Sequence, residues 1–447
     1  MLALYLSAYG ATLSHTDQLL LHIIMIFEGK GVSFSQAGFL WGATAQTYKA
    51  AAASSSAADA SGGNAMEVDD DGSSSSSSSS KEEQEDGDKG KIPVVELETF
   101  HSLLFSGQLT QHRHMLTTIR SFSPRLASAT SSQYILAEEL WPGNSHLQTP
   151  ALSSVYDARF LLRIYLFGMA YFPDFDCKKF IEVGGLSLVF QTLAAFDADL
   201  RQIGYMALAN FSSLLDKAET PMREATQVRV LLSVLQAAIA VENLQLSSIT
   251  ASFLGETSMI LVRPSHPLFL ELHNYLLSRP SLDLNSTPVW KRFFLSARTT
   301  SKIEREWVLR MVNCGLRAPS DLSLLGLRHG NAKITNTHTL GTIISHLGSQ
   351  MPSSFSTMSE RRHLWSILAK LISNDAPAYK NTLLGPGGLV PFLSLWTSSH
   401  SHFSSEGRLM TVPSASVPSL PVYAEVCTVL RAISKLPELG TLARSRP

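Results

Sequence analysis

The sequence of 447 residues is poor in cysteine and has no membrane-spanning run near its start. Its three cysteines, Cys177, Cys314 and Cys427, are 137 and 113 residues apart. This spacing is typical neither of a disulfide framework nor of a paired metal-binding motif, so we expect a reducing compartment. The most apolar early run, Leu19–Phe27, is short of the about 20 residues that a spanning helix needs. With no basic segment before it, we expect neither secretion nor membrane insertion.

Signatures of catalysis and of small-ligand binding are also lacking. The glycine-rich run at 385–388 has no following Lys-Ser or Lys-Thr, and Pro386 removes one amide donor that a phosphate would need. No serine lies in a Gly-x-Ser-x-Gly elbow, and no cysteine has a local nucleophile signature. The histidine pairs His112/His114 and His400/His402 lack the companions of a zinc site. We therefore predict no enzymatic activity, no metal, no cofactor and no small-molecule substrate.

Charge is scarce and unevenly distributed. Charged residues make up 16% of the chain and the formal net charge is −1. Residues 50–91 contain ten acidic and three basic residues, a local charge of −7, so the other 405 residues carry +6. The same segment contains eight consecutive serines and little apolar surface to offset the entropy of ordering, which predicts disorder. We hypothesise that this acidic insertion shields the basic body; the alternatives are that it recruits a basic partner or that it is a surface-loop insertion with no role.

Apolar residues recur at helical spacing through most of the chain, whereas sustained two-residue alternation is almost absent. The segment 180–216 reads as a short helix, a Gly184-Gly185 turn, a second helix, an acidic turn and a longer helix beginning near Leu200. This order is typical of an armadillo repeat, and a weaker unit is predicted at 384–396. We therefore predict an all-α fold: an armadillo/HEAT-like α-solenoid of stacked helix pairs with a disordered acidic, Ser-rich insertion.

Composition divides the chain into five predicted parts. They are an N-terminal helical segment that packs on the main body (1–48), a disordered acidic and poly-Ser insertion (49–91), helices with a Ser/Thr/Pro-rich connector (92–151), an armadillo-like helical domain (152–330), and further helical repeats with a Ser/Pro-rich loop near 397–421 (331–447).

The stretch 290–317 combines positive charge with aromatic residues. Its seven basic and two acidic residues give a local charge of +5, and Trp290, Phe293, Phe294 and Trp307 lie among them. Basic side chains beside aromatic rings are typical of single-stranded RNA sites. The basic side chains neutralise phosphates, and unpaired nucleobases stack on the rings. The alternative is a solvated basic helix face with Trp307 in the core. The candidate RNA contacts are Lys291, Arg292, Arg298, Lys302, Arg305, Arg310 and Arg317.

Several segments resemble the C-terminal region of the nucleolar pre-ribosomal-associated protein family. They are YGATLSHTDQLLLHIIMIFE at 9–28, FLWG at 39–42, VYDARFLL at 155–162, KIEREWVLRMVNCGLR at 302–317 and DLSLLGLRHG at 321–330. The resemblance covers 1–48 and about 150–330, and the last hundred residues only loosely. Members of this family are far longer, so we expect the chain to be a C-terminal fragment or a shortened gene model.

The resemblance implies a nucleolar, non-enzymatic scaffold of early large-subunit (60S) assembly. It would bind pre-ribosomal RNA and assembly factors and support processing of large-subunit rRNA. The family has no catalytic residues to transfer. The alternative is a generic armadillo-type peptide-binding adaptor in the nucleus or cytoplasm, which an apolar concave face with Asn and Trp ladders would favour.

Overall fold

The computed structural model describes residues 2–30, 41, 103–105, 109–127, 135–141, 150–172, 175–217, 222–325 and 358–373. Every regular element in these ranges is helical, which confirms the predicted all-α solenoid class. None of these helices is long and apolar enough to cross a membrane. The predicted disordered insertion and the predicted repeat at 384–396 lie outside the described residues. The chain divides into two compact units, Met1–Gln111 and His112–Pro447.

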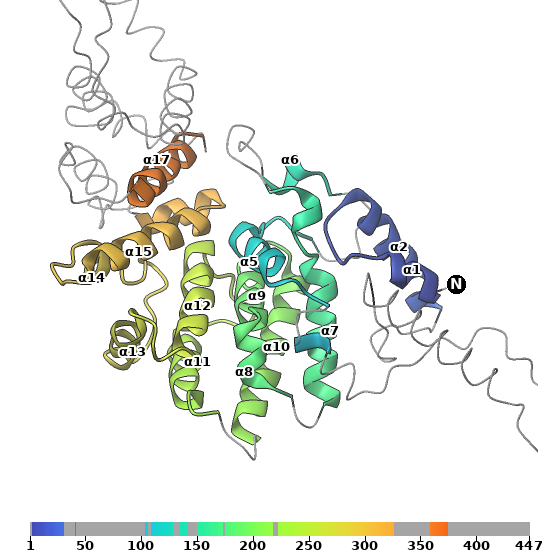
Figure 1. The fold of residues 1–447 in the computed structure, drawn as a ribbon, viewed down its shortest axis with the longest axis horizontal. Helices are drawn as coiled ribbons and strands as arrows, with labels where there is room; N and C mark the ends of the chain where they lie inside the picture. Colours follow the sequence, from blue (N-terminus) through green and yellow to red (C-terminus); the bar gives the residue numbers. More distant parts are fainter. Residues whose placement is uncertain are drawn as a thin grey trace, which may run out of the picture. The chain divides into compact units, whose positions relative to one another are not determined.

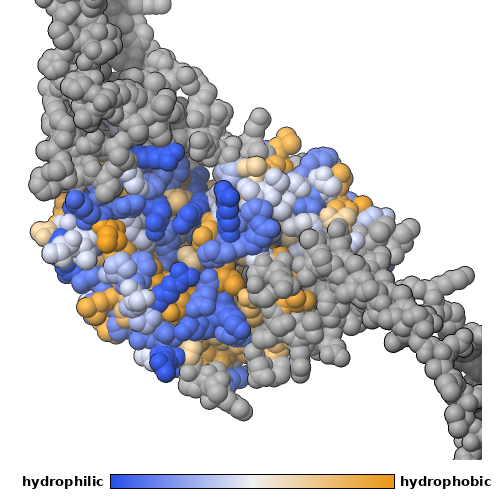
Figure 2. Space-filling model, viewed as in Figure 1, coloured by the Kyte–Doolittle hydropathy of each residue, from blue (hydrophilic) through white to orange (hydrophobic). Residues whose placement is uncertain are grey.

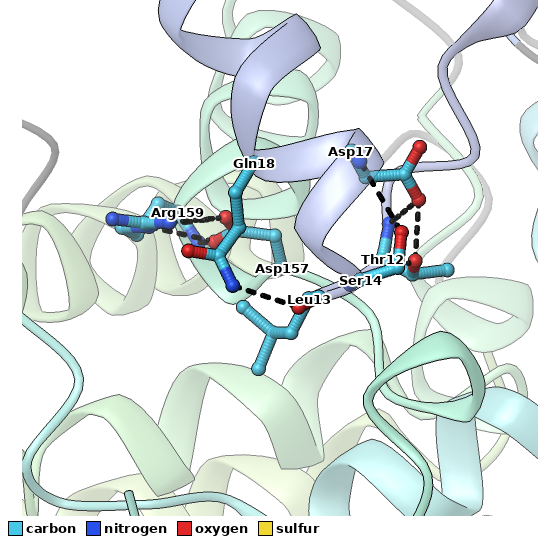
Figure 3. A network of polar contacts seen from close by, with 7 residues as sticks. All are labelled: Thr12, Leu13, Ser14, Asp17, Gln18, Asp157 and Arg159. Carbon is cyan, nitrogen blue, oxygen red and sulfur yellow. Dashed lines mark hydrogen bonds and ion pairs between the residues drawn. The ribbon is translucent and has the colours of Figure 1, made fainter. Parts of the chain in front are cut away.

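The first unit contains α1 (Leu2–Ala8) and α2 (His15–Gly29), which pack against each other. A serine ahead of an apolar helical run predicts a helix cap, and Ser14 caps α2: its hydroxyl accepts the Asp17 N–H at 3.2 Å. Asp17 in turn accepts the N–H groups of Gly10 and Thr12, at 2.9 and 3.0 Å, and the Thr12 hydroxyl (Figure 3). The connection between the two helices is therefore fixed by one buried carboxylate. The predicted packing of this segment on the main body stays a prediction.

The second unit begins with α5 (His112–Ser121), α6 (Ala137–Leu140), the 3₁₀ turn η1 (Leu152–Ser154) and α7 (Ala158–Tyr171). Asp157 caps α7 by accepting the Arg159 N–H at 2.9 Å, and the Arg159 guanidinium folds back onto the same carboxylate at 2.6 Å (Figure 3). Both residues are buried. The Asp-Ala-Arg of the VYDARFLL segment is therefore a helix start with an enclosed ion pair.

The predicted repeat at 180–216 is confirmed as three helices: α8 (Cys177–Glu182), α9 (Gly185–Thr192) and α10 (Ala198–Lys217). Gly184 makes the turn between α8 and α9 with φ of 93°, a left-handed conformation that favours glycine. A Cβ there would also lie 2.7 Å from the Cδ1 of Ile119 in α5. Helical spacing of the apolar residues after Leu200 predicts Leu214 on the buried face of α10, but Leu215 is buried there and Leu214 is half-buried.

Five more helices follow in the described ranges. They are α11 (Ala225–Ala238), α12 (Ser248–Leu261), α13 (Phe269–Leu277), α14 (Trp290–Phe294) and α15 (Ser301–Gly315), before the 3₁₀ segment η2 (Pro319–Leu325) and α17 (Met358–Ser373). Helices three places apart in this series pack most closely: α9 on α12, and α12 on α15 (Figure 1). A period of three helices is the period of an armadillo repeat, and α17 then packs on α15.

Helix α12 is the centre of this stack and is buried on nearly every side. Small residues allow the close approach of its neighbours: Ser187 of α9 donates its hydroxyl to the Gly255 carbonyl at 2.6 Å. Helix α5 lies against α9, α12 and α15. On the described part of the face drawn in Figure 2, hydrophilic side chains predominate and apolar ones are scattered among them.

Candidate nucleic-acid interface

The first three predicted RNA contacts lie on and after α14, beside α13. Arg292 and Arg298 both form ion pairs with Glu271 of α13; the Arg292 Nη2 to Glu271 Oε2 distance is 3.2 Å. The hydrogen bond from Arg298 is the main reason why the pKa of Glu271 is lowered. Lys291 is exposed and forms no ion pair with the described residues. The structure thus pairs two of these three positive charges with one carboxylate.

The next three candidates lie on α15, and two of them join it to its neighbours. Arg305 contacts Glu360 of α17, with Nε to Oε1 at 3.4 Å, and the Glu360 side chain is 0% exposed. Arg310 contacts Glu256 of α12, with Nη2 to Oε2 at 3.1 Å. Lys302, near the start of α15, is exposed. The charges of Arg305 and Arg310 therefore lie inside helix-helix contacts, while that of Lys302 faces solvent.

A polar seam continues the contact between α15 and α17. Asn313 accepts the Ser366 hydroxyl at 3.0 Å and pairs with the His363 ring at 3.3 Å. Burial lowers the pKa of His363 to about 4, and the positive charge of the nearby Arg310 contributes to this shift. His363 is therefore neutral at neutral pH and contributes hydrogen bonding to this seam without a charge.

Arg317, the last candidate, is a junction of three segments. Its Nη2 donates to the carbonyl oxygens of Ile119 and Arg120 at 2.8 and 2.9 Å, and so caps the end of α5. Its Nη1 donates to the Gln191 side chain of α9 at 2.6 Å, and its Nε to the Cys314 carbonyl at 2.7 Å. Burial lowers the pKa of Arg317 to about 10, so it stays charged at neutral pH.

The residue beside this junction that the sequence prediction missed is Asp321, in η2. Its Oδ1 accepts the Ser248 N–H at the start of α12 at 2.7 Å, and its Oδ2 accepts the N–H groups of Arg317 and Ala318 at 3.1 and 2.8 Å. Burial raises the pKa of Asp321, and these three donors oppose that rise. Asp321 opens the DLSLLGLRHG segment, but nothing in its local sequence reveals that it caps a helix 73 residues earlier.

The four aromatic residues predicted to stack RNA bases belong to the core. Trp290, Phe293, Phe294 and Trp307 are all buried. The Trp307 ring packs edge-on against Phe293 and Phe253, with centroids 5.6 and 6.3 Å apart. The alternative that placed Trp307 in the core is therefore confirmed.

The sequence model of the family described as Nucleolar pre-ribosomal-associated protein 1 matches residues 186–384, which include all seven predicted RNA contacts. Over these residues the chain is similar to the nucleolar pre-ribosomal-associated protein family. The chain is also 34% identical to Nucleolar pre-ribosomal-associated protein 1 of Mus musculus and 31% identical to that of Homo sapiens, over 168 residues each. These alignments cover 37% of this chain and 7% of either relative, so the chain corresponds to a small part of their length. No solved structure matches it.

Both relatives are named as nucleolar, and the predicted nucleolar localisation of this chain agrees with those names. The matched region corresponds to the stack from α9 to α17. The 302–317 segment, on which the resemblance most depends, supplies the contacts of α15 to α12, α17 and α5 described above. Its residues have a clear structural role, and RNA contact by the seven candidates stays a prediction.

The remaining titratable groups of the described ranges do not gather into a metal site: no cluster of three or more His, Cys, Asp or Glu side chains is found there. His114 packs edge-on against Tyr156, with centroids 5.7 Å apart, while His400 and His402 lie outside the described residues. Cys177 and Cys314 are free thiols, and burial raises the pKa of both, to about 11 for Cys177. Both are therefore protonated at neutral pH.

Proposed function

We propose that this chain is a non-catalytic nucleolar scaffold of ribosome biogenesis. It binds pre-ribosomal RNA and assembly factors of the early large-subunit particle, and it supports processing of large-subunit rRNA. The observation that carries this proposal is the family match over 186–384, together with the names of the two relatives. The structure supports a scaffold because the polar side chains of α12, α15 and η2 join helices to one another.

Among the seven predicted RNA contacts, Lys291 and Lys302 are the best placed to reach RNA, because their ammonium groups are exposed and unpaired within the described ranges. Arg298 is also exposed, although it shares Glu271 with Arg292. The peptide-binding adaptor gains no support from the described residues. Trp290 and Trp307 are buried, and the Asn313 side chain is engaged by α17, so these residues offer no exposed Asn and Trp ladder.

The proposal is tested by purifying the tagged chain from cells after RNA crosslinking, with sequencing of the RNA and identification of the co-purifying proteins. We expect large-subunit pre-rRNA and nucleolar assembly factors. A chain with Asp321→Ala, which we expect to be destabilised in the second unit, serves as the control for non-specific recovery. Recovery of peptide-motif partners without rRNA would overturn the scaffold and favour the adaptor.

The segregation of −7 on residues 50–91 from +6 on the rest leads to a prediction about salt dependence. Replacing the ten acidic residues of this insertion by Asn and Gln keeps its length and removes its competition for the basic body. We expect the affinity for RNA to rise about fivefold at low salt. This gain should vanish near 1 M salt, where the Debye length is about 3 Å and charges farther apart are screened from one another. Fluorescence anisotropy with a labelled RNA measures it. Equal affinities of the two chains at low salt would refute self-shielding.

A further inference from the structure

Helix α5 and the turn after it form an exposed basic surface outside the predicted RNA site. Arg113, Arg120 and Arg125 are exposed and have no ion pair within the described ranges. Residues 112–127 contain no acidic residue. Arg113 and Arg120 are seven residues apart and therefore share one face of the helix, about 10 Å apart along its axis. The opposite face buries Met115, Thr118 and Ile119.

This surface is held firmly by the rest of the unit. Arg317 caps the C-terminal end of α5, and the Trp141 Nε1 donates to the Ser121 carbonyl at 2.9 Å. The side chains of Met115 and Ile119 lie against Gly184 at the start of α9. A surface fixed in this way loses little conformational entropy when a ligand binds.

An exposed aromatic ring lies beside Arg125, the last of these arginines. The Phe196 side chain is 46% exposed, and its N–H donates to the Pro124 carbonyl at 2.7 Å, directly before Arg125. The Arg201 Nη1 donates to the carbonyls of Ala195 and Phe196 at 2.8 and 3.0 Å and so fixes this turn. An exposed arginine and an exposed ring therefore lie close together at this turn, whereas the aromatic residues of 290–317 are buried.

Two acidic residues follow Phe196 and bear on the local charge. Asp197 is committed to the start of α10, because its Oδ1 accepts the N–H groups of Asp199 and Leu200 at 2.9 and 3.0 Å. Asp199 lies in the first turn of the same helix, where the helix dipole favours a negative charge. Together with Arg201, the three exposed arginines outnumber these two acids, so the net charge of the surface remains positive.

We propose that Arg113, Arg120, Arg125 and Phe196, the α5 surface, bind single-stranded RNA. The three guanidinium groups neutralise backbone phosphates, and the Phe196 ring stacks on an unpaired base. Stacking requires an unpaired base, which is why the ligand is single-stranded rather than duplex RNA. This inference rests on the RNA binding of the proposed function and assigns it to a site other than the predicted one.

The test measures binding of the full chain to a fluorescein-labelled 20-nucleotide uridine strand and to a duplex of equal length, by anisotropy over a range of salt. Each phosphate contact with a single strand contributes about 0.7 to the slope of log affinity against log salt. We therefore expect Arg113→Gln/Arg120→Gln/Arg125→Gln to lower the slope by about 2. Phe196→Leu should weaken binding about tenfold, since it removes one stacked base, and Phe196→Trp should restore it.

Lys217→Gln/Arg223→Gln is the matched control, because it removes exposed charges that lie outside both the α5 surface and the predicted site and form no ion pair with the described residues; we expect its affinity to stay within about twofold of the unmodified chain. Loss of affinity in this control, with unchanged binding by the α5 variants, would overturn the inference while the proposed function stands. Equal binding of strand and duplex, with no effect of Phe196→Leu, would overturn it as well. An unmodified chain that binds neither RNA would overturn the RNA part of the proposed function. The replaced side chains are exposed, and thermal unfolding checks that the variants fold.

Discussion

Asp321→Ala is expected to lower the free energy of unfolding of the second unit by about 4 kcal/mol. The Asp321 carboxylate accepts three backbone N–H groups, from Ser248, Arg317 and Ala318, and is 0% exposed. Each buried donor left without an acceptor costs about 1–3 kcal/mol, and one of them begins α12, the centre of the stack. Urea unfolding followed by circular dichroism measures the change.

Asp283→Ala is the matched control for this substitution. Asp283 is exposed, and it accepts the Asn285 N–H at 3.0 Å and the Ser286 hydroxyl at 2.8 Å within one loop. Water replaces these bonds when the side chain is removed, so we expect a loss below about 1 kcal/mol. Asp321→Asn should fall between the two, because one acceptor oxygen remains. Equal losses for Asp321→Ala and Asp283→Ala would show that Asp321 does not hold η2 to α12.

Gly315→Ala is expected to destabilise the second unit by about 3 kcal/mol. A Cβ at this position would lie 2.6 Å from the Ile249 Cα and 3.0 Å from its N, both backbone atoms of α12. Backbone cannot rotate away as a flexible side chain can, so α15 and α12 must separate or bend. The midpoint of urea unfolding measures this loss.

The control is Gly29→Ala, at the end of α2, where a Cβ would meet nothing within 4 Å. We expect a change of less than about 1 kcal/mol there, because only helix propensity differs. If Gly315→Ala also proves neutral, the close approach of α15 to Ile249 is not required for the fold.

The order of helices at 180–216 followed from local signals alone. Gly184 and Gly185 predicted the turn that the structure contains, and the acidic residues after Phe196 predicted the start of α10. Turns and helix caps depend on residues close in sequence, and apolar periodicity defines which face is buried. Leu215 in place of Leu214 on the buried face of α10 is a shift that periodicity cannot resolve, because neighbouring helices decide it.

Whether the basic side chains of 290–317 form an RNA-binding surface depends on which acidic groups lie next to them in the fold. The local sequence does not contain that information. Arg305 meets Glu360 from 55 residues later, Arg310 meets Glu256 from 54 residues earlier, and Arg317 reaches Ile119, 198 residues away. A run of basic residues in a sequence predicts either a solvated helix face or an RNA-binding surface. The ion-pair partners that the fold supplies decide whether those residues are exposed at all. Conversely, local sequence does not mark Arg125 as part of a binding surface, because only the fold brings Phe196 beside it.

The sequence by itself determined the helical class, the turn at Gly184 and Gly185, the cap at Ser14 and the resemblance to a nucleolar family. Each of these is encoded within a few residues or within one contiguous segment. Only the tertiary structure decided which basic side chains join helices to one another and which face solvent. The physical reason is that a charge is neutralised by whatever lies within a few ångströms, and in a stack with a three-helix period those neighbours come from helices far apart in the chain.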